Sequence, residues 1–272
     1  MLAKKLIMYS SLTLFFKYIQ YLCKASNGKG HGVHSPFVYR FIREVLNPKA
    51  VHPSFGALEQ LRKALEKDSQ LVQVWDRGAG SRQTKSTDRS IGSIARAALK
   101  PKKYSQLLYK IANYYQPMSI LEMGTSLGIT TCYLALANEK AEVVTMEGAP
   151  HIALLAKKSF EKMGLQNIKL MEGDFNETLP AYIAKQDVIG LAYVDGNHRY
   201  APTIQYFKQL LAHSNEETIL IFDDIHWSEE MEKAWEEIKK DPAVTLTIDL
   251  FFIGLVFIRK AQKEKEHFII RY

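Results

Sequence analysis

From residue 104 onward, the chain alternates short apolar runs with longer segments in which apolar residues recur every three or four positions. The short runs predict buried β-strands, and the longer segments predict amphipathic helices. The expected helices are 104–115, 128–138, 150–163, 176–185, 203–211 and 229–239. The expected strands are 119–123, 142–146, 168–171, 188–194 and 218–222, followed by 244–248 and 253–258 with no helix between them. This order predicts an α/β domain with a doubly wound, mostly parallel sheet.

The first 103 residues do not follow this alternation. Helices are expected near 2–22, 37–46 and 58–66, and residues 76–103 are expected to form a loop rich in Gly, Ser and Arg that runs into a basic helix. No sheet is predicted in this part of the chain. We therefore expect residues 1–103 to be a helical, partly irregular extension, acting as a lid or dimerisation element, and residues 104–272 to be the functional domain.

Residues 2–22 are largely apolar and carry one polar stripe. Thr13, Lys17, Gln20 and Lys24 are four, three and four positions apart, so a helix places them on one narrow face. The rest of this helix is expected to be buried against the domain or a partner chain, or to lie on a membrane surface. Its polar interruptions argue against a transmembrane span, and the missing small-residue cleavage site argues against a signal peptide.

The composition is that of a globular protein, with 47% hydrophobic and 24% charged residues. The two cysteines, Cys23 and Cys132, are far apart and have no metal-binding or redox spacing, so a reducing, cytoplasmic setting is expected. Charge is uneven: residues 1–110 hold 20 Lys and Arg against 6 Asp and Glu, and residues 111–272 hold 16 against 23. The basic part is expected to meet an anionic partner or the acidic remainder, with a plain solvated surface as the alternative.

Residues 119–131, with the sequence SILEMGTSLGITT, predict a strand, a tight turn and the start of a helix. Such a turn directs backbone N–H groups towards a polar or anionic ligand. Gly124 permits backbone angles that other residues avoid, and Gly128 permits a close approach to the helix start. The spacing E-x-G-x-x-x-G is neither the G-x-G-x-x-G of a dinucleotide site nor a P-loop, because no Gly-Lys-Ser/Thr follows.

Ligands of open parallel sheets bind beyond the carboxyl ends of the strands, so polar residues there are the candidates. Glu147, after the second strand, is placed to accept hydrogen bonds from a ribose diol, or to interact with the dipole of the following helix. Asp174, after the third strand, can cap the next helix.

The fourth and fifth strands end in YVDGNHRY and IFDDIHW, which bring three carboxylates and two imidazoles towards one place. One explanation is a hard-cation site in which Asp195, Asp223 and Asp224 bind Mg²⁺ and acidify a substrate hydroxyl. The other is metal-free general-base catalysis by a histidine whose tautomer and charge are held by the carboxylates.

The E-x-G-x-x-x-G turn resembles motif I of the class I S-adenosylmethionine-dependent methyltransferases. The D-G-x-H-x-Y run from Asp195 to Tyr200 and the D-D-I run at Asp223 resemble the branch of small-molecule enzymes like catechol O-methyltransferase. The resemblance covers about residues 104–260. It implies a Rossmann-like methyltransferase fold with sheet order 3-2-1-4-5-7-6, in which the seventh strand is antiparallel.

The resemblance also implies S-adenosyl-L-methionine as the cofactor. The implied cofactor-binding residues are Glu122, Gly124, Thr125, Ser126, Gly128, Thr130, Glu147, Gly148, Asp174, Phe175 and Asp195. Among these, Thr130 is expected near the methionine carboxylate, and Asp174 with Phe175 near the adenine.

In the metal-dependent branch of this family, the metal ligands fall on Asp195, Asp223 and Asp224 of this sequence, but the catalytic lysine falls on His198. Since histidine titrates near neutral pH, we expect His198, with Asp195, to act as the base, and Mg²⁺ to be the alternative.

The sequence thus predicts a cytoplasmic methyltransferase (EC 2.1.1.-) that acts on a small-molecule hydroxyl. A homodimer in which a partner chain covers the apolar first helix is compatible with this prediction. One alternative is an RNA methyltransferase that uses the basic residues 77–103, but that segment lacks aromatic residues for stacking bases. The other is a cofactor-binding protein without turnover that contacts a membrane surface through residues 1–24.

Overall fold

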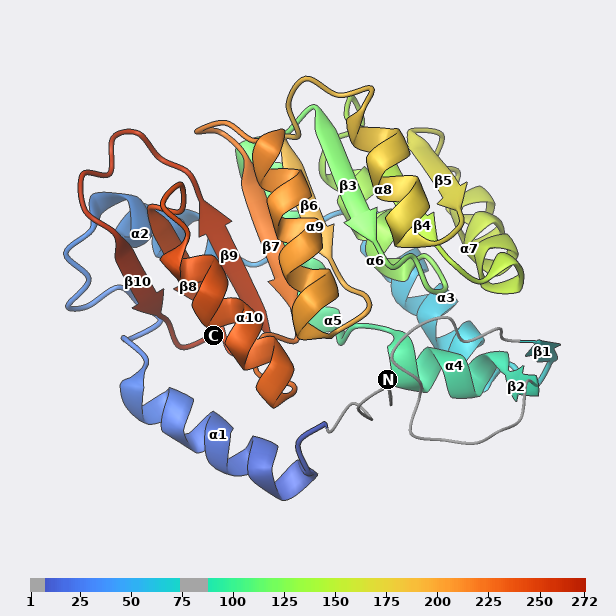
Figure 1. The fold of residues 1–272 in the computed structure, drawn as a ribbon. Helices are drawn as coiled ribbons and strands as arrows, with labels where there is room; N and C mark the ends of the chain where they lie inside the picture. Colours follow the sequence, from blue (N-terminus) through green and yellow to red (C-terminus); the bar gives the residue numbers. More distant parts are fainter. Residues whose placement is uncertain (1–7, 74–87) are drawn as a thin grey trace, which may run out of the picture. The chain divides into compact units, whose positions relative to one another are not determined.

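The computed structural model describes residues 8–73 and 88–272 (Figure 1). Residues 2–7 of the predicted first helix and residues 77–87 of the basic segment lie outside the described residues. The chain divides into two compact units, Met1–Arg43 with Tyr182–Tyr272, and Glu44–Ala181. The predicted boundary between residues 103 and 104 falls inside the second of these units and stays a prediction.

The Glu44–Ala181 unit contains three parallel strands in the order β3 (Ser119–Met123), β4 (Glu142–Glu147) and β5 (Ile168–Glu172). Leu121 is opposite Val144, and Val144 is opposite Lys169. Helices α6 (Ile129–Ala137), α7 (Pro150–Lys162) and α8 (Phe175–Ile183) follow the three strands in turn. Nearly all of β3 and β4 is buried, as expected for parallel strands covered on both faces. This is the 3-2-1 part of the predicted strand order.

The same unit begins with helix α3 (Phe55–Lys67) and continues through β1 (Leu71–Gln73), β2 (Asp88–Ser90), α4 (Ile91–Ala98) and α5 (Lys102–Tyr115). The basic helix expected before residue 103 is confirmed as α4. The expectation that residues 1–103 hold no sheet is wrong, because β1 and β2 pair as an antiparallel ribbon with Val72 opposite Arg89. Three-residue strands are too short for an apolar period of two to be visible in the sequence.

The other unit contains the strands β6 (Leu191–Val194), β7 (Ile219–Asp223), β9 (Ile253–Phe257), β8 (Leu246–Asp249) and β10 (Glu266–Ile269), in that spatial order. Strand β9 is antiparallel to both β7 and β8, which confirms the 4-5-7-6 part of the predicted order. Strand β10 pairs with β8 in parallel and was not predicted, because its sequence EHFI has no clear apolar pattern. Helices α9 (Tyr200–Ala212) and α10 (Glu229–Lys240) lie side by side across these strands in Figure 1.

Helix α1 (Ser11–Lys24) starts at Ser10, whose hydroxyl accepts a hydrogen bond from the Thr13 amide at 3.1 Å. It is followed by α2 (Pro36–Phe41) and a π-helical turn (Ile42–Leu46). The rings of Tyr18 and Tyr21 pack on Phe251, with centroid distances of 5.0 and 5.3 Å. Tyr21 is the one buried residue of α1, and Lys17 of the predicted polar stripe faces inward to Glu232. The expectation that the apolar part of this helix is buried against the domain is therefore wrong for most of its length, because the apolar side chains at residues 12, 15, 16 and 19 are exposed. Among the described helices, none is long and apolar enough to span a bilayer.

Candidate active site

The turn after β3 is fixed by backbone hydrogen bonds to the neighbouring strand. The amides of Gly124 and Thr125 both donate to the carbonyl of Met146, at 3.0 and 3.1 Å. Gly128 closes the turn with φ of +81°, and a Cβ at this position would lie 2.6 Å from Cε1 of Phe160. Glycine is thus required at residue 128 both by the backbone angle and by the close approach of α7.

Glu122 stabilises this turn through hydrogen bonds to buried hydroxyls. Its side chain is fully buried, and Oε2 accepts hydrogen bonds from the hydroxyls of Thr131 and Thr145, the latter at 2.7 Å. The Thr145 hydroxyl is also 2.6 Å from that of Thr125. These bonds tie β3, β4 and α6 together through one buried carboxylate. The contact of Glu122 with the cofactor stays a prediction.

Glu147 stands at the end of β4 and faces the turn. Its Oε2 accepts the Ser126 amide at 2.9 Å, and its Oε1 accepts the Ala149 amide at 3.0 Å. Burial raises the pKa of this carboxyl, and the bonds from the amides of Ala149, Ser126 and Gly148 oppose the rise. A carboxylate has about four acceptor positions, so with three amides bonded one position remains for a further hydrogen bond, such as that of a diol hydroxyl.

The Ser126 hydroxyl is buried beside this carboxylate. Ser126 has a φ of +49°, and its Oγ has no hydrogen-bond partner among the described residues. A buried hydroxyl without a partner is costly, and a polar ligand bound at the turn would satisfy it. Thr130, in the first turn of α6, is buried as well. The residues present at this turn therefore fit a polar ligand.

The end of β5 lies beside the end of β4. The Gly173 amide donates to the carbonyl of Glu147 at 3.0 Å, and Gly173 has a φ of +142°. Oδ1 of Asp174 accepts a hydrogen bond from the Asn176 amide at 2.8 Å. Asp174 therefore caps α8, which is one of the two roles predicted for it. The adenine contact predicted for Asp174 and Phe175 stays a prediction.

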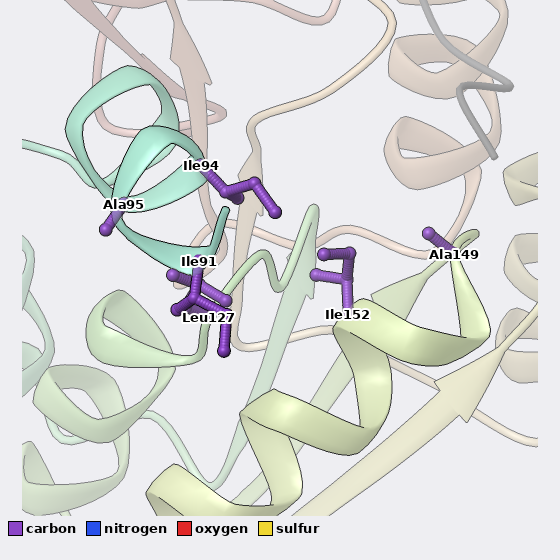
Figure 2. Close-up of a cluster of buried hydrophobic side chains, with 6 residues drawn as sticks. All are labelled: Ile91, Ile94, Ala95, Leu127, Ala149 and Ile152. Carbon is purple, nitrogen blue, oxygen red and sulfur yellow. The ribbon is translucent and has the colours of Figure 1, made fainter. Parts of the chain in front are cut away.

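A cluster of buried side chains joins α4 to the turn and to the start of α7 (Figure 2). Figure 2 shows Ile91 and Leu127 lying close together, with Ile152 next to them. The full cluster consists of Ile91, Ile94, Ala95, Leu127, Ala149 and Ile152. A helix from the N-terminal part of the chain thus supports the predicted cofactor turn, and sequence reasoning missed this, because the contact joins residues that are far apart in the chain.

In the other unit, Asp195 and His198 form a pair at the end of β6. Nε2 of His198 lies 3.5 Å from Oδ1 of Asp195, and the two side chains are 22% and 20% exposed. Asn197, with a φ of +55°, turns the chain between them. The pair is partly open to solvent, so the imidazole can exchange a proton with a bound molecule.

Tyr193 connects this pair to the other carboxylates. Its hydroxyl donates to Oδ2 of Asp195 at 3.0 Å, and the ring is fully buried. Burial and the charges of Asp195, Asp223 and Asp224 raise the pKa of this phenol well above its usual value. Tyr193 is therefore a neutral hydrogen-bond donor that orients Asp195.

The described residues contain no group of three or more His, Cys, Asp or Glu side chains that could hold a metal ion. Asp223 is fully buried in β7, whereas Asp224 lies beyond the strand with a φ of +53°. The binding of Mg²⁺ by Asp195, Asp223 and Asp224 stays a prediction.

His226, the second imidazole near these strand ends, is held by two carboxylates. Its Nδ1 lies 3.1 Å from Glu232 and its Nε2 lies 2.8 Å from Asp249. Burial alone would lower the pKa of His226, but the hydrogen bonds to Asp249 and Glu232 outweigh burial and raise it to about 9. His226 is thus a cation at neutral pH and cannot accept a proton. Of the two imidazoles, only His198 has the surroundings of a base.

Comparisons with known proteins show similarity to methyltransferases. Residues 121–225 match a family model described as a methyltransferase domain. The chain is 27% identical to a catechol O-methyltransferase of Niastella koreensis over 126 residues, which are 45% of this chain and 55% of that protein. It is 40% identical to a protein-L-isoaspartate O-methyltransferase of Magnetococcus marinus over 57 residues, or 21% of this chain and 24% of that protein. The chain thus matches 55% or less of the length of these curated relatives.

Solved structures show the same fold. An O-methyltransferase of Bacillus cereus in complex with SAH superposes with a TM-score of 0.55 and 19% identity, covering 81% of this chain and 97% of that one. The O-methyltransferase TomG of Streptomyces achromogenes in complex with SAM gives a TM-score of 0.53 and 18% identity, covering 60% and 82%. These likenesses confirm the predicted fold class, a Rossmann-like methyltransferase fold with a mostly parallel sheet and N-terminal helices.

Proposed function

We propose that this chain, which has the class I methyltransferase fold and a methyltransferase domain over residues 121–225, transfers the methyl group of S-adenosyl-L-methionine to a hydroxyl of a small molecule. The observation that carries the proposal is the pair formed by Glu147 and the amide of Ser126, with the buried Ser126 hydroxyl beside it. The relatives named as O-methyltransferases support hydroxyl oxygen as the acceptor.

The turn after β3 and the end of β4 hold the cofactor in this proposal. Glu147 accepts a hydrogen bond from the ribose diol, because its carboxylate is oriented by backbone amides and keeps an acceptor position. Ser126 and Thr130 offer hydroxyls to the amino-acid end. The remaining contacts with the cofactor are assigned to six further residues. These are Gly124, Gly128 and Gly148 through their backbone, and Thr125, Asp174 and Phe175. When bound, the cofactor supplies an electrophilic methyl group on a sulfonium.

His198 removes the proton of the acceptor hydroxyl. With the cofactor bound, the acceptor oxygen would take up the methyl group, and the sulfur would keep the electron pair of its broken bond to that carbon. Asp195, oriented by Tyr193, stabilises the imidazolium that His198 becomes. Because methyl transfer is an in-line displacement, the protein contributes chiefly by positioning the acceptor and by removing this proton.

Isothermal titration of S-adenosylhomocysteine into the purified chain tests the first half of this proposal. We expect micromolar or tighter binding, because the turn and Glu147 are already hydrogen-bonded to each other. Incubation with S-adenosylmethionine and a panel of phenols and catechols, followed by mass spectrometry, tests the second half. Absence of binding would overturn the proposal, and binding with methylation of nitrogen instead of oxygen acceptors would overturn the assignment of the acceptor.

A further inference from the structure

Helix α1 carries a continuous apolar stripe on its outer side. Leu12, Phe15, Phe16 and Ile19 recur at helical spacing and are 65%, 56%, 56% and 42% exposed. The rings of Phe15 and Phe16 meet edge to face, with centroids 5.8 Å apart. Single exposed apolar residues are common on protein surfaces, but four on one helix face form a patch that indicates an interaction site.

The opposite side of α1 holds the helix in place. Lys17 pairs with Glu232 of α10 at 2.9 Å, and the Tyr9 hydroxyl donates to the same carboxylate at 2.8 Å. The Tyr21 hydroxyl donates to the carbonyl of Ile270, and Arg271 donates to the carbonyl of Leu22 at 2.8 Å. Because the inner side is bonded to α10 and to the C-terminal segment, the outer stripe is presented by a fixed helix.

The segment that bears the stripe is strongly basic. The first 43 residues contain seven Lys or Arg and no Asp or Glu. Lys24, in the last turn of α1, is exposed. An apolar stripe with aromatic residues, with the exposed Lys24 at its end and no acidic residue in its segment, is complementary to a bilayer surface with anionic headgroups.

A second copy of this chain is a poorer occupant of the stripe. A twofold contact would place two acid-free, basic segments against each other, and like charges in an interface oppose association. A stable dimer buries about 800 Å² per subunit, which is more than four partly exposed side chains supply. The 14 residues of α1 also fit a helix that lies in the plane of the interface.

We propose that α1 docks this protein on anionic lipid bilayers, with Leu12, Phe15, Phe16 and Ile19 entering the headgroup region and Lys24 near the lipid phosphates. This function is independent of methyl transfer, since α1 contains none of the residues assigned to the cofactor or the acceptor. It gives the basic N-terminal part of the chain a partner of opposite charge.

Co-sedimentation of the full chain with vesicles tests this proposal. We expect binding to vesicles of equal parts phosphatidylcholine and phosphatidylglycerol, weaker binding at high salt, and little binding to pure phosphatidylcholine. The double variant Phe15→Gln/Phe16→Gln should lower the bound fraction about tenfold. The matched control is Met118→Gln/Leu154→Gln, which removes two side chains that are 64% and 53% exposed in the other unit and should leave binding unchanged.

Circular dichroism and sedimentation equilibrium on the same proteins complete the test. All variants should keep the wild-type helix content, because the substituted side chains are exposed. Equal vesicle binding by wild type and the Phe15→Gln/Phe16→Gln variant would overturn the proposal, as would no binding by wild type. A wild-type dimer that this variant converts to a monomer would also overturn it, because the stripe would then be covered by a second copy.

Discussion

Glu147 and Glu172 lie opposite each other in the register of β4 and β5, but their surroundings differ. Both oxygens of Glu147 accept backbone amides in the predicted cofactor turn. Glu172 is 41% exposed and pairs with Lys157 at 2.6 Å on the surface. An exposed ion pair contributes little to stability, whereas a buried carboxylate aimed at a turn indicates a ligand contact.

We therefore predict that Glu147→Ala weakens the binding of S-adenosylhomocysteine by about 1–3 kcal/mol, because the hydrogen bonds to the ribose are lost and the turn loses its acceptor. Isothermal titration measures the change. Glu172→Ala is the matched control and should bind as wild type does. Wild-type affinity in Glu147→Ala would remove the ribose assignment.

The pair formed by Asp195 and His198 leads to a prediction about kcat. Replacing His198 by Gln removes the base and should lower kcat by about 10²–10⁴-fold, with S-adenosylhomocysteine affinity unchanged. The control is His151→Gln, an exposed histidine in α7, for which kcat should stay at the wild-type value. A His198→Gln variant with normal kcat would show that another group takes the proton.

Packing between elements connects α4 to the predicted cofactor turn. Ile94 is 5% exposed and belongs to the cluster that contains Leu127 of the turn and Ile152 of α7. Truncating it leaves a cavity under the turn that the surrounding residues fill only in part. Loss of this support is expected to affect ligand binding as well as stability.

The prediction is that Ile94→Ala lowers the free energy of unfolding by about 2–4 kcal/mol and weakens S-adenosylhomocysteine binding. Denaturant unfolding and isothermal titration measure the two effects. Ile238→Ala, in α10 of the other unit, removes an isoleucine that is 1% exposed and should cost similar stability without changing affinity. Equal losses of affinity in both variants would argue against a specific role of α4.

His226 joins three elements through its two carboxylate partners, Glu232 of α10 and Asp249 of β8. Glu232 also binds Tyr9 and Lys17, so the network extends to α1. The hydrogen bonds with His226, Lys17 and Tyr9 lower the pKa of Glu232 to about 2 although burial alone would raise it. Protonated His226 therefore faces a Glu232 carboxylate that stays charged.

This network predicts a specific dependence of stability on pH. Because the pKa of His226 rises from 6.5 to about 9 on folding, its contribution is complete below pH 6.5 and is lost as the pH rises towards 9. The contribution is on the order of 3 kcal/mol. Denaturant unfolding of wild type should show this loss between pH 6.5 and 9, whereas His226→Gln should be less stable at pH 6.5 and show less change over that range. Parallel curves for the two proteins would contradict it.

For the whole molecule, the sequence predicted the elements that are long or fully buried. Strand β3 was predicted with the observed bounds, since its apolar run is uninterrupted and a glycine turn follows it. Strands β1, β2 and β10 were missed because three or four residues of mixed polarity carry no period.

The site residues were predicted where they follow a strand directly in the sequence. The support of the turn by α4 and the charge of His226 could not be predicted, because they depend on contacts with residues that are distant in the chain. His226 depends on Asp249, which lies 23 residues away, and nothing in the local pattern indicates that pair. Tertiary contacts of this kind decide which of two similar histidines can act as a base.

The reaction of the whole chain is expected to need the cofactor and an acceptor, but no metal ion. His198 lies beside Asp195 and can take the proton unaided. The rate of methylation of an identified acceptor should therefore change by less than about twofold after the protein is dialysed against EDTA. Added Mg²⁺ should not raise this rate. The His198→Gln variant, assayed in the same buffers, separates a loss of the base from a loss of metal. Activity that disappears with EDTA and returns with Mg²⁺ would instead assign Asp195, Asp223 and Asp224 to a metal site that forms only when the acceptor binds.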